Sequence, residues 1–200
     1  MNYEELKSEL VSLGFSDESE LNEFGDIVPQ ALNRAITEIN LTVAPIIGTY
    51  EFTQTGEDSR LLYYDMEELT KEDGDVVFLS FADTPVMVNN NANEQYGAYR
   101  RYNNFEVEQD RILVMDGSVA GSFKVFYKKA HVPFTINTDN SEDIPLPLKA
   151  HILVPLLTAY YVWLEDEKTK AVDYYNQYEK LAQSILNDKP VRMRILSGGI

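Results

Sequence analysis

The spacing of hydrophobic residues along this 200-residue sequence changes twice. Near both ends, large aliphatic and aromatic side chains recur every three or four positions, which is the period of an amphipathic helix. From Thr49 onward the period is two, in runs such as TYEFTQT, RILVM and SFKVFYKKA that are rich in β-branched and aromatic residues. This order predicts an α+β protein: a helical bundle from N- and C-terminal helices, with an inserted antiparallel β subdomain and an extended C-terminal tail.

The N-terminal part of the bundle, residues 1–48, is expected to hold three helices. The first has an apolar stripe with helical spacing, Leu6, Leu10 and Leu13. Gly14 then stands where glycine commonly ends a helix. Ser16 precedes an acidic stretch that fits a short second helix, and Asp26 is placed to cap a longer third one. Pro45 ends this helical region.

Residues 49–137 are expected to form the β subdomain. Strand-like runs alternate with turn signals, among them Gly74 and the asparagine cluster 89–93. The stretch FEVEQDRILVM predicts a hairpin that turns at Gln109 and Asp110.

Residues 138–187 are expected to hold a linker and a closing pair of helices. Pro147 sets up a helix start near Leu148, and Pro155 is expected to kink that helix because proline lacks an amide hydrogen. The last helix carries one broad apolar face made of Ala171, Tyr174, Tyr175, Tyr178, Leu181, Ala182 and Ile185.

The formal net charge is −16, from 33 acidic and 17 basic residues. Such a surface is poorly suited to gripping nucleic acid or an anionic membrane, since both need lysine and arginine to neutralise phosphates. The charge fits plain solubility, or a wall past which DNA slides without sticking. The N-terminus lacks a signal-peptide core, and the apolar run 152–164 is too short to span a bilayer. We therefore expect a soluble protein made in a cytoplasm, with no membrane partner.

No motif for chemistry is present. There are no cysteines, and neither His131 nor His151 has metal-ligand spacing, so we expect structural histidines and no catalytic residue, metal or cofactor. Residues 138–143, TDNSED, fit a polar linker better than a cation site. Glu106 and Glu108 would share one face of a strand, which leaves an acid-dependent hydrolase as a minor alternative.

The C-terminal tail, residues 188–200, is basic within an acidic protein. After Pro190, apolar and basic residues alternate, which suits a strand added to the sheet edge of a partner. The predicted contact segment consists of Val191, Arg192, Met193, Arg194, Ile195 and Leu196.

Two stretches, DIVPQALNRAITEIN and IPLPLKAHILVPLLTAYYVWLEDEKTKAVDYYNQYEKLAQSIL, resemble the early helix and the closing helical pair of the head–tail adaptor proteins of tailed bacteriophages, also called connector or head-completion proteins. A helical bundle that is interrupted by a β region and followed by a C-terminal extension is also similar to their layout. The matching segments cover roughly a third of the chain, and their motifs are loose patterns of residue type.

The resemblance implies a structural virion protein and no enzyme. It implies a homo-oligomeric ring, usually a dodecamer in this family, at the neck of the virion and assembled in the host cytoplasm. The portal protein would lie on one side and tail or neck proteins on the other, with DNA passing non-specifically through the lumen. The tail segment 191–196 would then contact the portal protein or a neighbouring subunit.

A binding module is the main alternative. The Tyr/Asn-rich segment 89–105, NNNANEQYGAYRRYNNF, holds stacking rings and hydrogen-bonding amides that could recognise a saccharide or a peptide. The same composition also fits a long polar loop.

Overall fold

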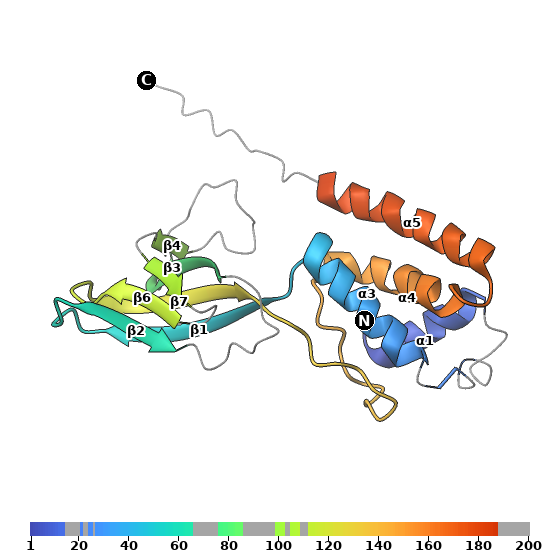
Figure 1. The fold of residues 1–200 in the computed structure, drawn as a ribbon, viewed down its shortest axis with the longest axis horizontal. Coiled ribbons are helices and arrows are strands. Elements are labelled where there is room, and N and C mark those ends of the chain that lie inside the picture. The colour runs from blue at the N-terminus through green and yellow to red at the C-terminus, as the bar shows by residue number, and fades with distance from the viewer. Residues whose placement is uncertain are drawn as a thin grey trace, which may run out of the picture. The chain divides into compact units, whose positions relative to one another are not determined.

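The computed structural model describes residues 1–14, 21, 24–25, 27–65, 76–85, 99–102, 105–108 and 112–187, with only the backbone described in 76–85 and 99–102. The chain divides into two compact units, one helical and one made of strands (Figure 1). The helical unit joins Met1–Ile46 to Ala130–Asn187, and the β unit lies within Ile47–Lys129. The predicted α+β class, with helices from both ends of the chain and an antiparallel β insertion, is confirmed.

Helix α1 (Tyr3–Ser12) begins with a capping box. The Asn2 side chain accepts a hydrogen bond from the Glu5 backbone nitrogen at 2.8 Å, and the Glu5 carboxylate accepts one from the Asn2 nitrogen at 3.0 Å. Leu13 is the C-cap, and Gly14 follows it with a φ of 123°, which glycine adopts without strain. The predicted first helix and its glycine end are confirmed. The predicted second helix and the Asp26 cap lie outside the described residues.

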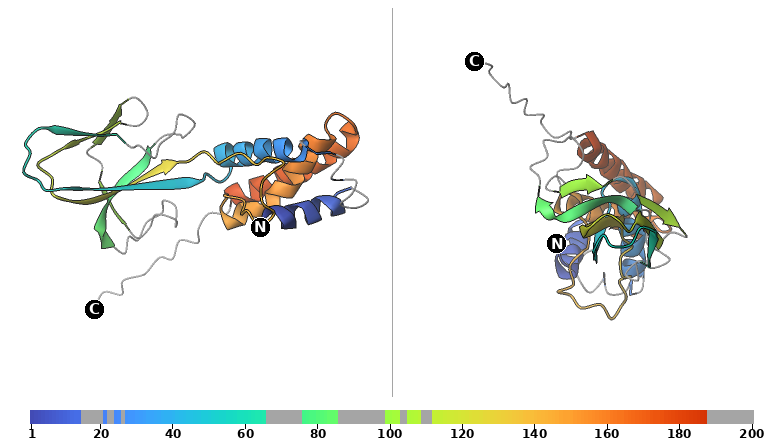
Figure 2. Two further views of the ribbon diagram at one scale, coloured as in Figure 1. Left: turned by 90° about the horizontal axis from the view of Figure 1, so that it is seen from below. Right: turned by 90° about the vertical axis from the view of Figure 1, so that its left-hand side faces the viewer.

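Helix α3 (Ile27–Thr42) supplies the centre of the helical core. Its apolar face is fully or almost fully buried and consists of Val28, Pro29, Ala31, Leu32, Ala35, Ile36 and Ile39. The face repeats every three to four residues, as expected for a helix that is covered on one side. Helix α4 packs against it, and helix α5 packs against α4 (Figures 1 and 2).

The expected kink at Pro155 is wrong. A 3₁₀ helix, η2 (Leu148–Leu153), comes first, and helix α4 (Val154–Trp163) begins after it with Pro155 in its first turn. The amide groups of a first turn have no partner inside the helix, so a proline there breaks no hydrogen bond. Pro155 therefore marks the start of α4 and does not bend a longer helix.

Helix α5 (Lys168–Asn187) closes the helical unit with the predicted face. Ala171, Tyr178 and Ala182 are buried, and the other apolar residues of that face are partly buried against the core. The N-terminal half of α5 is held to the end of α1, because the Tyr174 hydroxyl donates a hydrogen bond to the Leu13 carbonyl and Lys170 Nζ donates one to the Gly14 carbonyl at 3.2 Å.

The segment after the β unit belongs to the helical unit, although the sequence analysis grouped residues 130–137 with the strands. Asn33 of α3 explains this. Its side-chain amide donates to the Phe134 carbonyl and its oxygen accepts from the Phe134 nitrogen, both at 2.8 Å. The Nε2 atom of His131 lies 3.1 Å from the same oxygen. One partly buried amide thus fixes this extended segment against α3.

The β unit holds two antiparallel sheets. The four-stranded sheet has the order β1-β7-β3-β4, and its strands are β1 (Ile47–Gln54), β7 (Gly121–Lys128), β3 (Val76–Pro85) and β4 (Tyr99–Tyr102). The three-stranded sheet has the order β2-β6-β5, and its strands are β2 (Leu61–Asp65), β6 (Ile112–Asp116) and β5 (Phe105–Glu108). The pairing of β5 with β6 confirms the predicted hairpin, whose turn residues lie outside the described ranges.

The two sheets face each other across a small aromatic core. Buried residues of β6 and β7, namely Leu113, Met115, Phe123, Val125 and Tyr127, form its centre. The rings of Phe52 on β1 and Tyr64 on β2 lie 4.2 Å apart between their centroids. Gln54, which is 4% exposed, donates to the carbonyls of Asp116 and Val119 and accepts from the Tyr64 hydroxyl. The buried Gln54 side chain thus joins the two sheets, and both its nitrogen and its oxygen have hydrogen-bond partners.

Candidate interaction surfaces

Most of the residues that the sequence analysis singled out for partner contact lie outside the described residues. Residues 191–196 lie outside the described residues, which end at Asn187. Of the Tyr/Asn-rich segment 89–105, the description covers only β4 and Phe105 at the start of β5. Four of its residues thus belong to a strand that pairs with β3, and the expectation of one long loop is wrong for that part.

A cluster of tyrosines occupies the junction of α3, α4 and α5. We call Tyr160, Tyr161, Tyr175 and Tyr178 the tyrosine cluster. Ring centroids lie 5.0 Å apart for Tyr160 and Tyr161, 4.9 Å apart for Tyr160 and Tyr175, and 5.7 Å apart for Tyr175 and Tyr178. These are tilted contacts of the kind that aromatic side chains favour.

Helix α3 contributes two charged residues to this cluster. The Tyr161 hydroxyl donates a hydrogen bond to Glu38 Oε2 at 2.5 Å, and the Arg34 guanidinium lies 5.9 Å from the centre of the Tyr161 ring. Burial raises the pKa of Tyr161, and the hydrogen bond and negative charge of Glu38 raise it further. Burial likewise raises the pKa values of Tyr175 and Tyr178. These phenols are therefore neutral donors over the whole physiological range.

Much of the aromatic content of the closing helices is thus used within the subunit. Tyrosines contact one another, Trp163 packs against Phe24 with ring centroids 5.7 Å apart, and Lys170 Nζ lies 3.5 Å from the Trp163 ring centroid. The aromatic residues alone do not require a partner.

Three of the exposed aliphatic residues lie on η2 and in the last turn of α5. On η2, Leu148 is 82% exposed and Ile152, four residues later, is 57% exposed. Leu186, in the last turn of α5, is 51% exposed. η2 packs against α5, and α4 follows η2 directly before a short turn leads into α5, so η2 and the last turn of α5 lie at the same end of the helical unit. We call Leu148, Ile152 and Leu186 the apolar end.

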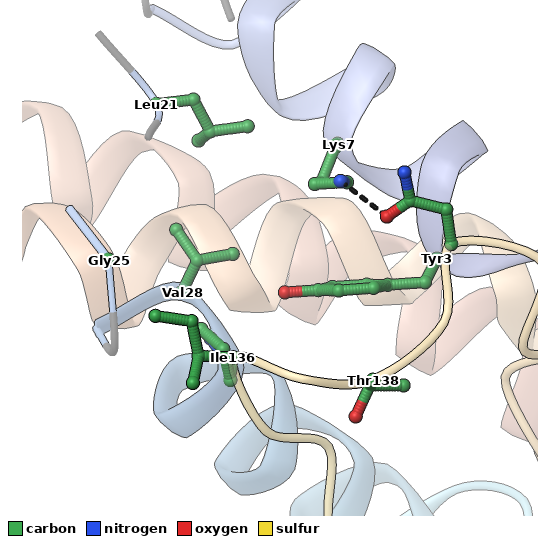
Figure 3. A pocket seen from close by; sticks show the side chains of 9 residues that line it. Tyr3, Lys7, Leu21, Gly25, Val28, Ile136 and Thr138 are labelled. Carbon is green, nitrogen blue, oxygen red and sulfur yellow. Dashed lines mark hydrogen bonds between the residues drawn. The ribbon is translucent and has the colours of Figure 1, made fainter. Parts of the chain in front are cut away.

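A pocket of about 310 Å³ is lined by residues of α1, the start of α3 and the segment 136–140. Figure 3 shows the Tyr3 hydroxyl pointing toward Val28 and Ile136, and the hydrogen bond of 2.7 Å from Lys7 Nζ to Asn140 Oδ1. The full lining is Tyr3, Lys7, Leu21, Gly25, Val28, Pro29, Ile136, Thr138 and Asn140. This described lining holds neither a histidine nor a carboxylate, and its titratable side chains are Tyr3 and Lys7.

Both histidines have structural partners. His131 bonds to Asn33, whose oxygen already accepts from a backbone amide, so Nε2 of His131 is the donor. Burial lowers the pKa of His131. His151 lies within hydrogen-bonding distance of the Met1 nitrogen through Nδ1, at 3.1 Å, and of the Leu146 carbonyl through Nε2, at 2.8 Å.

The acidic residues noted in the sequence are either exposed on a strand or hydrogen-bonded within a turn. Glu106 and Glu108 are exposed on β5. Asp139 accepts hydrogen bonds from the backbone and hydroxyl of Ser141, at 2.8 and 2.7 Å, which lowers its pKa and closes the turn within TDNSED. Across the described ranges, no three histidine, aspartate or glutamate side chains converge in a way that could hold a metal ion. None of the helices described here is both long and apolar enough to cross a membrane.

The sequence matches no protein-family model, and no curated protein is significantly similar to it.

Proposed function

We propose that this chain is a structural virion protein of a tailed bacteriophage: a head–tail adaptor that forms a ring under the portal protein and joins it to the tail. The observation that supports this most is the apolar end. Leu148 and Ile152 on η2 and Leu186 in the last turn of α5 are exposed, η2 packs against α5, and an exposed apolar surface favours contact with another protein.

A ring needs one surface of each subunit to contact a different surface of the next, because such a heterologous contact closes after a fixed number of copies. The apolar end supplies one of these two surfaces. A contact of modest area, repeated around a ring, stabilises the whole assembly even where a single pair of subunits is weakly bound.

The charge fits this role. With 33 acidic and 17 basic residues, the chain makes a poor surface for gripping DNA and a suitable wall for a channel through which DNA passes. The proposal places the protein at the neck of the virion after assembly in the host cytoplasm, between the portal protein and the tail or neck proteins. The tail segment 191–196 is the proposed contact with the portal protein or a neighbouring subunit.

The mass of the native assembly tests the proposal. We expect the purified chain, alone or mixed with the portal protein of the same genome, to form a closed ring that native mass spectrometry and electron microscopy both detect. A chain that stays monomeric under both conditions contradicts the proposal.

Substitutions at the apolar end sharpen this test. The double change Leu148→Glu with Ile152→Glu is expected to raise the dissociation constant of the contact between subunits at least tenfold, and so to give smaller species. The reason is that two carboxylates would have to leave water at the contact. Val132→Glu is the control, since Val132 is an aliphatic residue that is 84% exposed and belongs to neither η2 nor α5. Equal effects of the two changes would contradict a role for the apolar end.

A further inference from the structure

The free edge of β1 has little protection. β1 is the outer strand of its sheet and pairs with β7 over all eight of its residues without a break in register. Within the described ranges, no strand pairs with its other side. Folded proteins protect such edges with charged side chains, proline, a bulge or a short strand, and between Ile47 and Gln54 β1 has one of these, the exposed carboxylate of Glu51.

The core beneath this edge is also incompletely covered. Tyr50 and Phe52 point into the core of the β unit but remain partly exposed, whereas their β7 partners Val125 and Phe123 are fully buried. A further strand beside β1 would lie about 4.8 Å away and would place its own side chains next to these two rings.

We propose that the free edge of β1 accepts residues 191–196 of a second copy of this chain as an added strand. In an extended segment, Val191, Met193 and Ile195 share one face and the two arginines share the other. The apolar face would then cover Tyr50 and Phe52. The opposite face would bring Arg192 and Arg194 to the outer side of β1, where Thr49, Glu51 and Thr53 are exposed.

Charge favours the same pairing. The carboxylate of Glu51 contacts Lys124 at 2.5 Å but its side chain is exposed, so its other lone pairs can accept from an arginine. The β unit holds 15 acidic and 8 basic residues within 47–129, whereas the tail carries Lys189, Arg192 and Arg194. The positive charge of Lys124 would repel the two arginines. The negative charge of the exposed Glu51 is therefore the attraction on which this pairing depends.

Strand length selects β1 among the outer strands. β4 and β5 have four residues each and β2 has five, so only β1, with eight, can pair along a whole six-residue segment. The donor is a second copy because, in a ring, each subunit lies beside another copy whose tail can reach its surface. For that step alone the inference rests on the proposed function.

The cysteine-free sequence allows a direct test with the full chain. Two batches are mixed, one carrying Ser197→Cys and the other Thr49→Cys or Thr53→Cys, and a short bismaleimide is added. We expect covalent dimers between the two batches, and the better-reacting threonine position reports whether the added strand runs parallel or antiparallel to β1. The inference is overturned if neither threonine position gives mixed dimers. It is also overturned if a chain that carries Ser197→Cys together with one of the threonine changes forms cross-links only within itself.

A charge swap shows whether the contact is the proposed one. Glu51→Arg in the acceptor is expected to lower the yield of mixed dimers at least fivefold, and Arg192→Glu with Arg194→Glu in the donor is expected to restore it. Glu57→Arg is the matched control, because Glu57 is equally exposed but lies beyond the end of β1. An equal loss with Glu57→Arg, or no rescue by the donor change, overturns the inference.

Hydrogen exchange separates this inference from the proposed function. In the full chain, amides of β1 are expected to exchange at least tenfold more slowly than in the Arg192→Glu, Arg194→Glu chain, while the amides of α3 are unchanged. Unchanged β1 exchange overturns strand addition even if a ring forms, whereas slowed exchange in a small oligomer upholds strand addition and counts against the ring.

Discussion

The partly buried Asn33 and the buried Gln54 show how single side-chain amides organise each unit. Asn33 uses both ends of its side chain on the backbone of Phe134 and also accepts from His131. Gln54 also uses both ends of its side chain, donating to the carbonyls of Asp116 and Val119 and accepting from the Tyr64 hydroxyl. Removing such a group leaves several buried partners without a hydrogen bond, at about 1–3 kcal/mol for each one. Their effect on stability is therefore larger than that of most surface residues.

His131 makes the stability of the helical unit depend on pH. Burial lowers its pKa in the folded chain, so as the pH falls the unfolded chain takes up this proton first. The contribution of neutral His131 is fully present above its unfolded pKa of about 6.5 and is lost as the pH falls through that value toward the lower folded pKa. We expect the free energy of unfolding to decrease between pH 7.5 and pH 5.5.

The matched variant is His131→Gln, which keeps a side-chain donor near Asn33 but cannot be protonated. Urea unfolding of both chains at the two pH values, followed by far-ultraviolet circular dichroism, gives the difference that belongs to His131, because all other groups titrate alike in both. A steeper loss of stability toward low pH in the variant than in the parent would contradict the assignment.

At the scale of elements, the helix starts depend on local chemistry that the sequence displays. The capping box of α1 gives hydrogen-bond acceptors to two backbone amides that would otherwise lack a partner. We expect Asn2→Ala to destabilise the helical unit by about 1 kcal/mol and Asn2→Ser to have less than half of that effect, because serine can also accept from the Glu5 amide. Thermal unfolding followed by circular dichroism measures both, and equal losses would show that the cap is not the cause.

Pro155 and β2 show where local chemistry is insufficient. The expected kink assumed one helix from Leu148 to Leu164, whereas η2 ends at Leu153 and makes Pro155 a first-turn residue. β2, LLYYD, was not predicted as a strand because five residues carry too little alternation to be distinguished from a loop. Its strand conformation comes from pairing with β6, which lies some fifty residues later in the sequence.

At the scale of the whole molecule, both connections between the units lie at one place. Ile47 pairs with Lys128 at the start of β1, so the chain leaves and re-enters the helical unit at adjacent backbone positions. Among the described residues, the buried core of the helical unit is drawn from Met1–Ile46 and Ala130–Asn187, without a side chain of the β unit.

We therefore expect the helical unit to fold without the insertion. A chain in which residues 47–129 are replaced by a short Gly/Ser linker should keep its helical circular dichroism and unfold in one cooperative transition, because a paired antiparallel position leaves only about 5 Å to bridge. Leu32→Ala in the same background is the control, and it should lower the stability by about 2–5 kcal/mol if the core is native. A shortened chain without a cooperative transition would contradict the independence of this unit.

The sequence by itself determined the α+β class, the helical repeat of α1, α3 and α5 and the β5–β6 hairpin, because each depends on hydrophobic period and on turn or cap residues a few positions apart. Only the tertiary structure decided that tyrosines of α4 and α5 contact one another, that residues 130–137 join the helical unit, and that β1 is the outer strand among the described strands of its sheet. These depend on pairs such as Asn33 with Phe134 and Tyr161 with Glu38, which are more than 100 residues apart. Contacts between such distant residues leave no repeat in the sequence, because any spacing along the chain can place two side chains together once the helices and strands have packed.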